Sequence, residues 1–286
     1  MPFGFFPFGS KKRSGVAVVE IHGVIGTRVG IAAYSRLFDS VAQNKRYRAL
    51  LLDIDSPGGS ASGSEVLYHD ILRVAEKKPV VAYVRGMGAS GGYYLCCAAS
   101  RVFALPTAMV GSIGVIYLRP VLEQLLGKVG VQFSVFKSGA LKDMTGFWRS
   151  PTSEEEGKFQ ELIGEVFENF VSVVAKGRSM DRDKVKELAT GEVFTGARGK
   201  ELGLVDGLGG FYQALETAAE LGQTRPRPMW VRPRRTFSDR LMGRTAGGGG
   251  ANQGGLDQIG NQLQQLMAGG LYYMDPSYIL GGYNGD

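Results

Sequence analysis

A short apolar run, residues 79–84, is followed by a glycine-rich turn that reads Gly-Met-Gly-Ala-Ser-Gly-Gly over residues 86–92. The run is typical of a buried parallel strand, and the small apolar residues 93–99 after the turn favour a buried helix. We therefore expect Ser90 on a tight turn between a strand and a helix N-terminus. The unpaired N–H groups of the first helical turn would point towards its hydroxyl.

Three interpretations of this turn compete. Gly86, Gly88 and Gly91 match the dinucleotide-binding pattern G-x-G-x-x-G, which needs an acidic residue about 20 positions later. Residues 101–116 contain no Asp or Glu. Residues 88–92 also match G-x-S-x-G, the pattern of a serine nucleophile on a sharp turn. In the third interpretation the glycines only let a helix pack closely on a sheet.

Strand-like and helix-like patterns alternate over most of the chain. Strands are predicted over residues 16–21, 49–54, 79–84, 102–105, 112–117 and 132–136, and helices over residues 31–43, 64–76, 93–99, 120–129, 154–175, 181–189, 197–202 and 211–221. Such alternation predicts an α/β fold with a largely parallel sheet, flanking helices and right-handed crossovers.

The composition divides the chain into three parts. We expect a flexible aromatic and basic leader over residues 1–15, a folded domain over residues 16–222, and an Arg/Pro/Gly-rich tail over residues 223–286. The tail is expected to hold one short amphipathic helix at residues 259–267 and to lack fixed structure from residue 271. Residues 225–244 contain seven Arg and one Asp and so carry a net charge of +6, which is the net charge of the whole chain. The basic balance therefore does not indicate a nucleic-acid-binding domain.

The sequence predicts neither a membrane-spanning helix nor a cleaved signal peptide. No apolar run reaches the about 18 residues of a membrane-spanning helix, and residues 1–15 lack the apolar core and cleavage site of a signal peptide. We expect a cytoplasmic location, with at most weak contact between the leader and a membrane surface. Cys96 and Cys97 are adjacent in a predicted buried helix, so we expect core residues and not a disulfide or a metal site.

A second glycine-rich turn, Asp-Ser-Pro-Gly-Gly-Ser at residues 55–60, follows the strand predicted at residues 49–54. Ligands of open α/β sheets bind outside the carboxyl ends of the strands, so both turns can face one crevice. The N–H groups of Gly58, Gly59 and Gly91 could then supply the two donors of an oxyanion hole. Taken alone, Ser-Pro-Gly-Gly is also common in turns that have no catalytic role.

A serine nucleophile needs a base. His22 follows the first predicted strand and His69 falls in the middle of a predicted helix, so we expect both to be structural. Lysine is the other known partner of a serine nucleophile, and it acts as a base only where burial lowers its pKa. Lys142 follows a strand and a glycine turn and could face the crevice. Spacing alone does not choose it over Lys137 or Lys128.

Four motifs occur in a characteristic order. They are Ser-Pro-Gly-Gly at residues 56–59, Ala-Ser-Gly-Gly-Tyr-Tyr at 89–94, Gly-Ser-Ile-Gly-Val-Ile at 111–116 and Lys-Ser-Gly-Ala-Leu-Lys-Asp at 137–143. Together they resemble the signal peptide peptidase A family of serine–lysine proteases, in its short single-domain form. The resemblance covers residues 15–222.

The resemblance implies a role for each residue of the site. Ser90 would be the nucleophile, Lys142 the general base, Ser112 the hydroxyl that orients the lysine, and the N–H groups of Gly58 and Gly91 the oxyanion hole. It also implies a ClpP/crotonase-like α/β superfold, and peptide substrates such as signal-peptide remnants or other short, unfolded chains. It implies no cofactor and no metal, and a ring-like homo-oligomer in which serine and lysine meet across a boundary between copies.

Asp143 and the predicted helix at residues 154–175 follow the predicted base in the sequence. Asp143 is expected to face solvent, because a close carboxylate would raise the pKa of Lys142 and oppose its role. The predicted helix at residues 154–175 carries a wide apolar face, which a closed oligomer would protect.

Two other functions fit the turns without a serine–lysine pair. A crotonase-type acyl-CoA enzyme would share the fold and the oxyanion hole. A catalytically idle scaffold at a membrane surface would use the aromatic leader and the Arg-rich tail.

Overall fold

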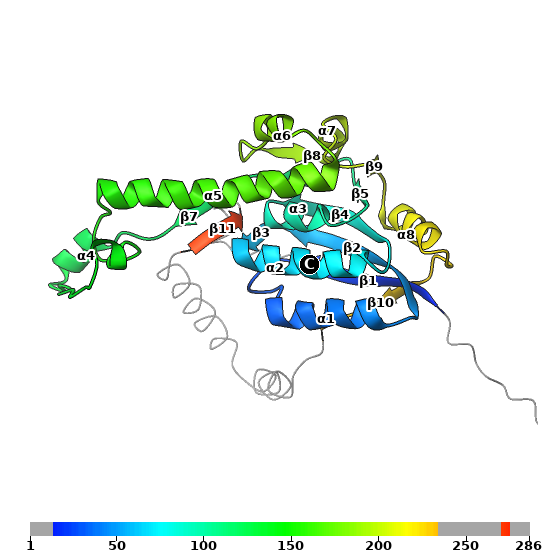
Figure 1. Ribbon diagram of the computed structural model, residues 1–286, viewed down its shortest axis with the longest axis horizontal. Helices are drawn as coiled ribbons and strands as arrows, with labels where there is room; N and C mark the ends of the chain where they lie inside the picture. Colours follow the sequence, from blue (N-terminus) through cyan, green and yellow to red (C-terminus); the bar gives the residue numbers. More distant parts are fainter. Residues whose placement is uncertain (1–13, 234–269, 275–286) are drawn as a thin grey trace, which may run out of the picture.

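The computed structural model describes residues 14–233 and 270–274. Its centre is a mostly parallel sheet with the strand order β10-β1-β2-β4-β5-β9 (Figure 1). These strands are β1 Gly15–His22, β2 Tyr47–Ser56, β4 Val80–Ala89, β5 Arg101–Ala104, β9 Gly207–Leu208 and β10 Pro228–Trp230. At the end of β4, β6 (Met109–Gly111) continues the parallel pairing, and β8 (Val193–Thr195) pairs antiparallel with β6.

Helices cover both faces of the sheet, because alternate side chains of its central strands are apolar on both sides. Ala17 and Val19 face a large core with α1 (Ile31–Gln43), α2 (Ala61–Ala75), α3 (Gly91–Cys96) and α5 (Ser153–Arg178). Val16 and Val18 face α8 (Phe211–Leu221) on the other side. Two small helices, α6 (Arg182–Leu188) and α7 (Gly196–Glu201), complete the body. The predicted α/β class with a largely parallel sheet is confirmed.

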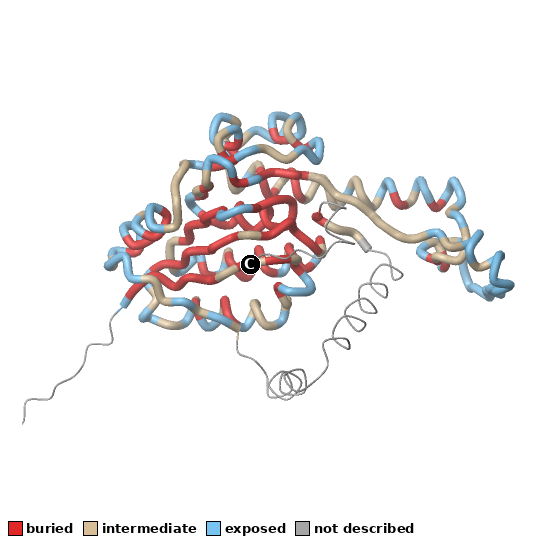
Figure 2. The backbone as a smooth tube through the Cα atoms, turned by 180° about the vertical axis from the view of Figure 1, so that it is seen from behind, coloured by how far each residue is buried: buried red, intermediate tan, exposed pale blue. Residues whose placement is uncertain are grey.

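Residues 119–152, which we call the protrusion, extend away from the body beside the N-terminal half of α5 (Figure 1). They carry only the short helices α4 (Glu123–Lys128) and η1 (Ala140–Asp143). Figure 2 shows the contrast between the buried strands of the body and the mostly exposed or half-buried protrusion. The prediction of a strand over residues 132–136 is wrong, because no neighbouring strand pairs with this run among the described residues.

Of the strand predicted over residues 112–117, only Ile116 and Tyr117 lie in a strand. β6 ends at Gly111, Ser112 has a positive φ of 50°, and pairing resumes only at β7 (Ile116–Leu118). For a residue with a side chain, a positive φ interrupts the regular backbone of a strand. β7 instead joins a small separate sheet with the order β3-β11-β7, in which β3 is Gly58–Ser60 and β11 is Gly270–Met274.

Two strands come from the segment predicted as a tail. β10 pairs parallel with β1, and its Trp230 ring stacks on Phe211 with ring centroids 5.5 Å apart and an interplanar angle of 6°. β11 pairs antiparallel with β3 and β7, so the expectation of no fixed structure from residue 271 is wrong for its first residues. The predicted boundary at residue 222 therefore leaves out two strands. The predicted helix at residues 259–267 and nearly all of the leader lie outside the described residues.

In the described part of the chain, no helix combines the length and the apolar character needed to cross a bilayer.

Close packing of α5 on the end of α3 depends on Gly177, and this yields a prediction. A methyl group added at Gly177 would lie 2.3 Å from the Cys97 carbonyl oxygen, whereas one added at Gly164 of the same helix meets nothing within 4 Å. We expect Gly177→Ala to lower the free energy of unfolding by about 1–3 kcal/mol through overpacking. Gly164→Ala should raise it by about 0.5–1 kcal/mol, because alanine is the better helix former. Chemical denaturation measures both changes, and equal stabilisation by the two variants would contradict this packing.

Candidate active site

Ser90 lies between β4 and α3 in a conformation that only its surroundings can hold. Its φ is 51°, a region that L-residues rarely adopt. The Ser90 N–H donates to the Gly111 carbonyl at 2.7 Å, and its own carbonyl accepts from the Tyr94 N–H at 2.8 Å. The residue is buried, yet it borders a cavity. Such a strained turn at the end of a strand is typical of a nucleophilic serine.

The two glycine-rich turns pack directly against each other, as the sequence predicts. A methyl group at Gly92 would lie 2.7 Å from the Ser56 carbonyl oxygen, and one at Gly58 would lie 2.7 Å from the Gly91 nitrogen. Gly58 also has a φ of +100°, which favours glycine. Only residues without a Cβ atom allow this approach.

The N–H of Gly58 already has an acceptor in this structure. It donates to the Ser56 hydroxyl at 3.2 Å, and that hydroxyl donates to the Gly23 carbonyl at 2.7 Å. Gly58 can therefore serve an oxyanion only by exchanging this bond.

Ser112 shares a cavity of about 300 Å³ with Ser90. It follows β6 with a φ of 50°, and its N–H donates to the Glu192 carbonyl at 2.7 Å. The remaining lining residues come from the stretch after Ser112, from α5, from the segment before β8 and from β11; they are Gly114, Val115, Ile116, Phe167, Ala189, Thr190, Gly191 and Met274. The cavity thus unites the two serines that the sequence analysis singled out.

Lys142 lies elsewhere. It belongs to η1 in the protrusion, where it is exposed, and it does not line the Ser90 cavity. The structure therefore brings together Ser90, Ser112, Gly58 and Gly91 within one chain but leaves out the predicted base.

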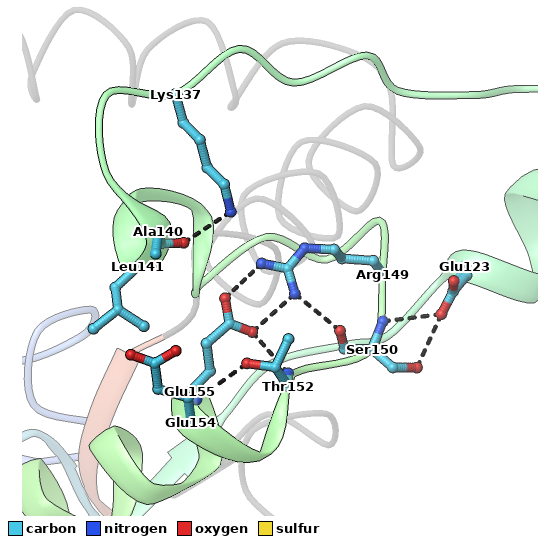
Figure 3. A pocket seen from close by; sticks show the side chains of 9 residues that line it. All are labelled: Glu123, Lys137, Ala140, Leu141, Arg149, Ser150, Thr152, Glu154 and Glu155. Atoms are coloured by element: carbon cyan, nitrogen blue, oxygen red, sulfur yellow. Dashed lines mark hydrogen bonds and ion pairs between the residues drawn. The ribbon is translucent and has the colours of Figure 1, made fainter.

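Ion pairs hold η1 against the start of α5. Asp143 is buried and accepts from Lys137 at 2.5 Å and from the Arg149 guanidinium. Arg149 also forms a bidentate pair with Glu155, at 2.5 and 2.8 Å (Figure 3). Glu155 in turn accepts from the N–H of Thr152 in the capping box that begins α5. The expectation that Asp143 faces solvent is therefore wrong.

These contacts decide which groups near η1 are charged. Hydrogen bonds from Arg149 and then Lys137 lower the pKa of Asp143 to about 2, and those from Arg149 lower the pKa of Glu155 to about 2. Asp143 is thus a carboxylate neutralised by residues other than Lys142. Lys137 is bound to Asp143 and to the Ala140 carbonyl and does not line the Ser90 cavity, so its position makes it a poor candidate base.

Neither histidine and neither cysteine lines the Ser90 cavity. His22 Nε2 is 3.7 Å from a carboxylate oxygen of Asp53 on the sheet, and His69 is exposed on α2. Cys96 and Cys97 are buried, and burial raises the pKa of Cys97 to about 12, so its thiol is unreactive. These positions agree with the structural roles expected for all four residues.

Sequence reasoning missed the contribution of β11, whose Met274 lines the cavity. The run Leu-Tyr-Tyr-Met at residues 271–274 is rich in residues that favour strands, and this signal could have been used.

Comparisons with known proteins show the family of the chain. The model of peptidase family S49 matches residues 73–225, and the model of the Clp protease family matches residues 25–111. A putative protease of Synechocystis is 41% identical over 77% of this chain and 79% of its own length. A putative signal peptide peptidase of Enterococcus faecium is 37% identical over 62% of this chain. A chloroplast serine protease of Arabidopsis thaliana is 33% identical over 73% of this chain.

The chain spans only part of two of these relatives, namely 52% of the Enterococcus protein and 31% of the Arabidopsis protein. Among solved structures, a membrane-bound, stomatin-specific protease in complex with a substrate peptide matches with a TM-score of 0.53 and 18% identity. That match covers 82% of this chain and 98% of the other. It shows the fold, which is that of the ClpP-like proteases.

The ion pairs of the protrusion predict sensitivity to acid. The pKa values of Asp143 and Glu155 are depressed to about 2, whereas unfolded carboxyls titrate near about 4. The stabilisation they provide is therefore complete above about pH 4.5 and is lost as the pH falls towards about 2. We expect Trp148 of the protrusion to report this loosening by fluorescence, with Trp230 replaced by Phe.

In this background, Arg149→Met should already show the loosened signal at pH 7, since it removes the shared partner of both carboxylates. Arg198→Met, which breaks an exposed pair on α7, serves as the control. Identical acid titrations for Arg149→Met and the parent would show that the network does not hold the protrusion.

Proposed function

The chain belongs to peptidase family S49 and is a serine-type peptidase, and from this premise we propose that it cleaves peptide chains internally with Ser90 as nucleophile and Lys142 as general base. The observation that carries the assignment of Ser90 is its strained turn at the cavity. There the N–H of Gly91 follows the serine at the start of a helix.

The chemistry follows from these positions. The Ser90 oxygen attacks the carbonyl carbon of the substrate while the neutral amine of Lys142 takes the hydroxyl proton. The oxyanion is stabilised by the N–H of Gly91 and by a second N–H from the turn at Gly58. The lysine then gives the proton to the leaving amine, and an acyl-enzyme remains. Water, activated by the same lysine, releases the acyl group and restores the serine. These steps need no metal or other cofactor.

Ser112 is proposed to position the lysine. It borders the same cavity as Ser90, and its backbone is fixed by the bond from its N–H to Glu192. A hydroxyl oxygen there can accept a hydrogen bond from a lysine that enters the cavity.

We propose that this lysine comes from a second copy of the chain. Within one copy, Lys142 is exposed on the protrusion and does not line the cavity. The protrusion also exposes many large apolar side chains, which are Val121, Leu125, Val129, Val131, Phe133, Val135 and Phe136. An apolar surface of this kind marks an interface. A ring of copies would cover it and enclose the sites.

Enclosed sites would restrict the substrates. Short or unfolded peptides, such as remnants of signal peptides, could enter such a ring, whereas folded proteins could not. We propose that class of substrate for this peptidase.

Labelling tests the nucleophile. A fluorophosphonate should modify Ser90, as peptide mapping would show. Ser90→Ala should abolish both the labelling and peptide hydrolysis, with a loss of about 10⁴-fold or more in kcat. Ser40→Ala, an exposed serine on α1, is the matched control and should behave as the parent. Hydrolysis close to the parent rate in Ser90→Ala would refute the assignment.

The pH dependence tests the base. The general base must be unprotonated to act, so the acylation rate should rise with pH on the alkaline side. Lys142→Ala should lose most of the activity together with this rising limb, whereas Lys200→Ala, an exposed lysine on α7, should keep both. A limb that persists unchanged in Lys142→Ala would assign the base to another group.

A further inference from the structure

The amino-terminal edge of the central sheet is strongly basic. Four segments reach this edge beside the starts of β2, β4, β5 and β10, and they are residues 44–48, 76–79, 100–101 and 222–227. They contain eight Lys or Arg residues and one acidic residue, Glu76. Seven of the eight basic residues are exposed, and Lys78 is half-buried. We call these eight residues the basic edge.

Backbone hydrogen bonds fix the four segments side by side. The N–H groups of Gly15 and Val16 in β1 donate to the carbonyl oxygens of Arg46 and Arg227, each at 3.0 Å. The other two segments are joined to neighbouring strands by bonds of 2.9 Å. Since strands in a sheet lie about 4.8 Å apart, the starts of β10, β1, β2, β4 and β5 span about 20 Å. The basic edge is therefore one continuous surface, at the end of the body where the chain enters β1 (Figure 1).

Among the residues that the structure describes, no carboxylate forms an ion pair with any side chain of the basic edge. Lys78 and Arg101 donate to backbone carbonyl oxygens instead. Burial lowers the pKa of Lys78, and the charges of Lys77 and Arg48 lower it further. Positive charges held together in this way favour a partner that carries many negative charges.

Apolar and aromatic residues adjoin the basic edge. Leu221 at the end of α8 is 47% exposed, and a methyl group at Gly222 would lie 2.8 Å from the Arg48 carbonyl oxygen. The side-chain oxygen atoms of Ser14 and Thr224 are 3.4 Å apart, so the chain enters the body at this edge. The leader contains four Phe and three basic residues before Ser14. Aromatic and basic residues together favour an anionic lipid surface, because the rings enter the head-group layer while the cations contact the phosphates.

We propose that the basic edge binds the phosphate head groups of an anionic lipid bilayer, and that the leader strengthens this binding. Ser90 lies at the other edge of the sheet, after the 10 residues of β4. At about 3.3 Å per residue, the two edges are about 30 Å apart. Lipid bound at the basic edge would therefore not cover the cavity of Ser90. Binding there does not depend on the chemistry proposed for Ser90.

The test is co-sedimentation of the full chain with vesicles of phosphatidylcholine, either alone or mixed with about one third phosphatidylglycerol. The parent should bind only the vesicles that contain phosphatidylglycerol, and added salt should weaken the binding because it screens the charges. Arg46→Gln combined with Arg48→Gln should weaken the binding about tenfold or more, because each basic residue near an anionic surface contributes a several-fold factor. Arg225→Gln combined with Arg227→Gln, in a different segment, should have the same effect.

A matched control removes the same charge elsewhere. Arg198→Gln combined with Lys200→Gln, at exposed positions of α7, should bind as the parent does. The Tm of each variant shows whether it is folded, and if one variant of the basic edge unfolds, the other decides. The proposal is overturned if the parent does not sediment, if it binds both kinds of vesicle equally, or if the folded variants of the basic edge bind as tightly as the parent. Tighter binding to duplex DNA than to the anionic vesicles, at equal phosphate concentrations, would identify a nucleic acid as the partner and overturn the proposal as well.

Discussion

The candidate site depends on the close approach of two glycine-rich turns at the carboxyl ends of β2 and β4. Parallel pairing of these strands puts Ser56 beside Gly88 and so sets the two turns next to each other. Gly58, Gly91 and Gly92 have no Cβ atom, and this absence lets the turns touch. The positive φ of Ser90 then follows from the hydrogen bonds on either side of it. The helix that starts after Ser90 is fixed in turn by α5, which packs on its end at Gly177.

In the proposed mechanism, the body and the protrusion contribute different parts of the chemistry. The body holds Ser90, the proposed oxyanion donors and the hydroxyl of Ser112 on buried elements. The protrusion carries Lys142 on a short helix that Asp143, Arg149 and Glu155 anchor to α5. Because the proposed base, Lys142, does not line the cavity of Ser90 within one copy, the proposed site is complete only after assembly. A single copy would then be inactive, which would confine hydrolysis to assembled copies.

Apolar runs and glycine-rich turns in the sequence predicted the central strands of the sheet and the turn that carries Ser90. The apolar runs at residues 49–54 and 79–84 are strands, and the turn after the second one carries Ser90 as expected. The run at residues 132–136 also favours a strand, but a strand needs a partner, and the described part of the chain offers none beside it. The strand β11 was missed for the opposite reason, because its partners lie more than 150 residues earlier. The burial of Asp143 also depends on partners that sequence spacing does not show.

A mixing experiment tests most directly whether the nucleophile and the base meet across a boundary between copies. Full chains with Ser90→Ala and with Lys142→Ala, each inactive alone, would be dissociated, combined in equal amounts and reassembled. Boundaries that pair an intact serine with an intact lysine should restore about a quarter of the parent activity. Mixed oligomers that form but stay inactive, or an active parent enzyme that sediments as a monomer, would contradict the shared site.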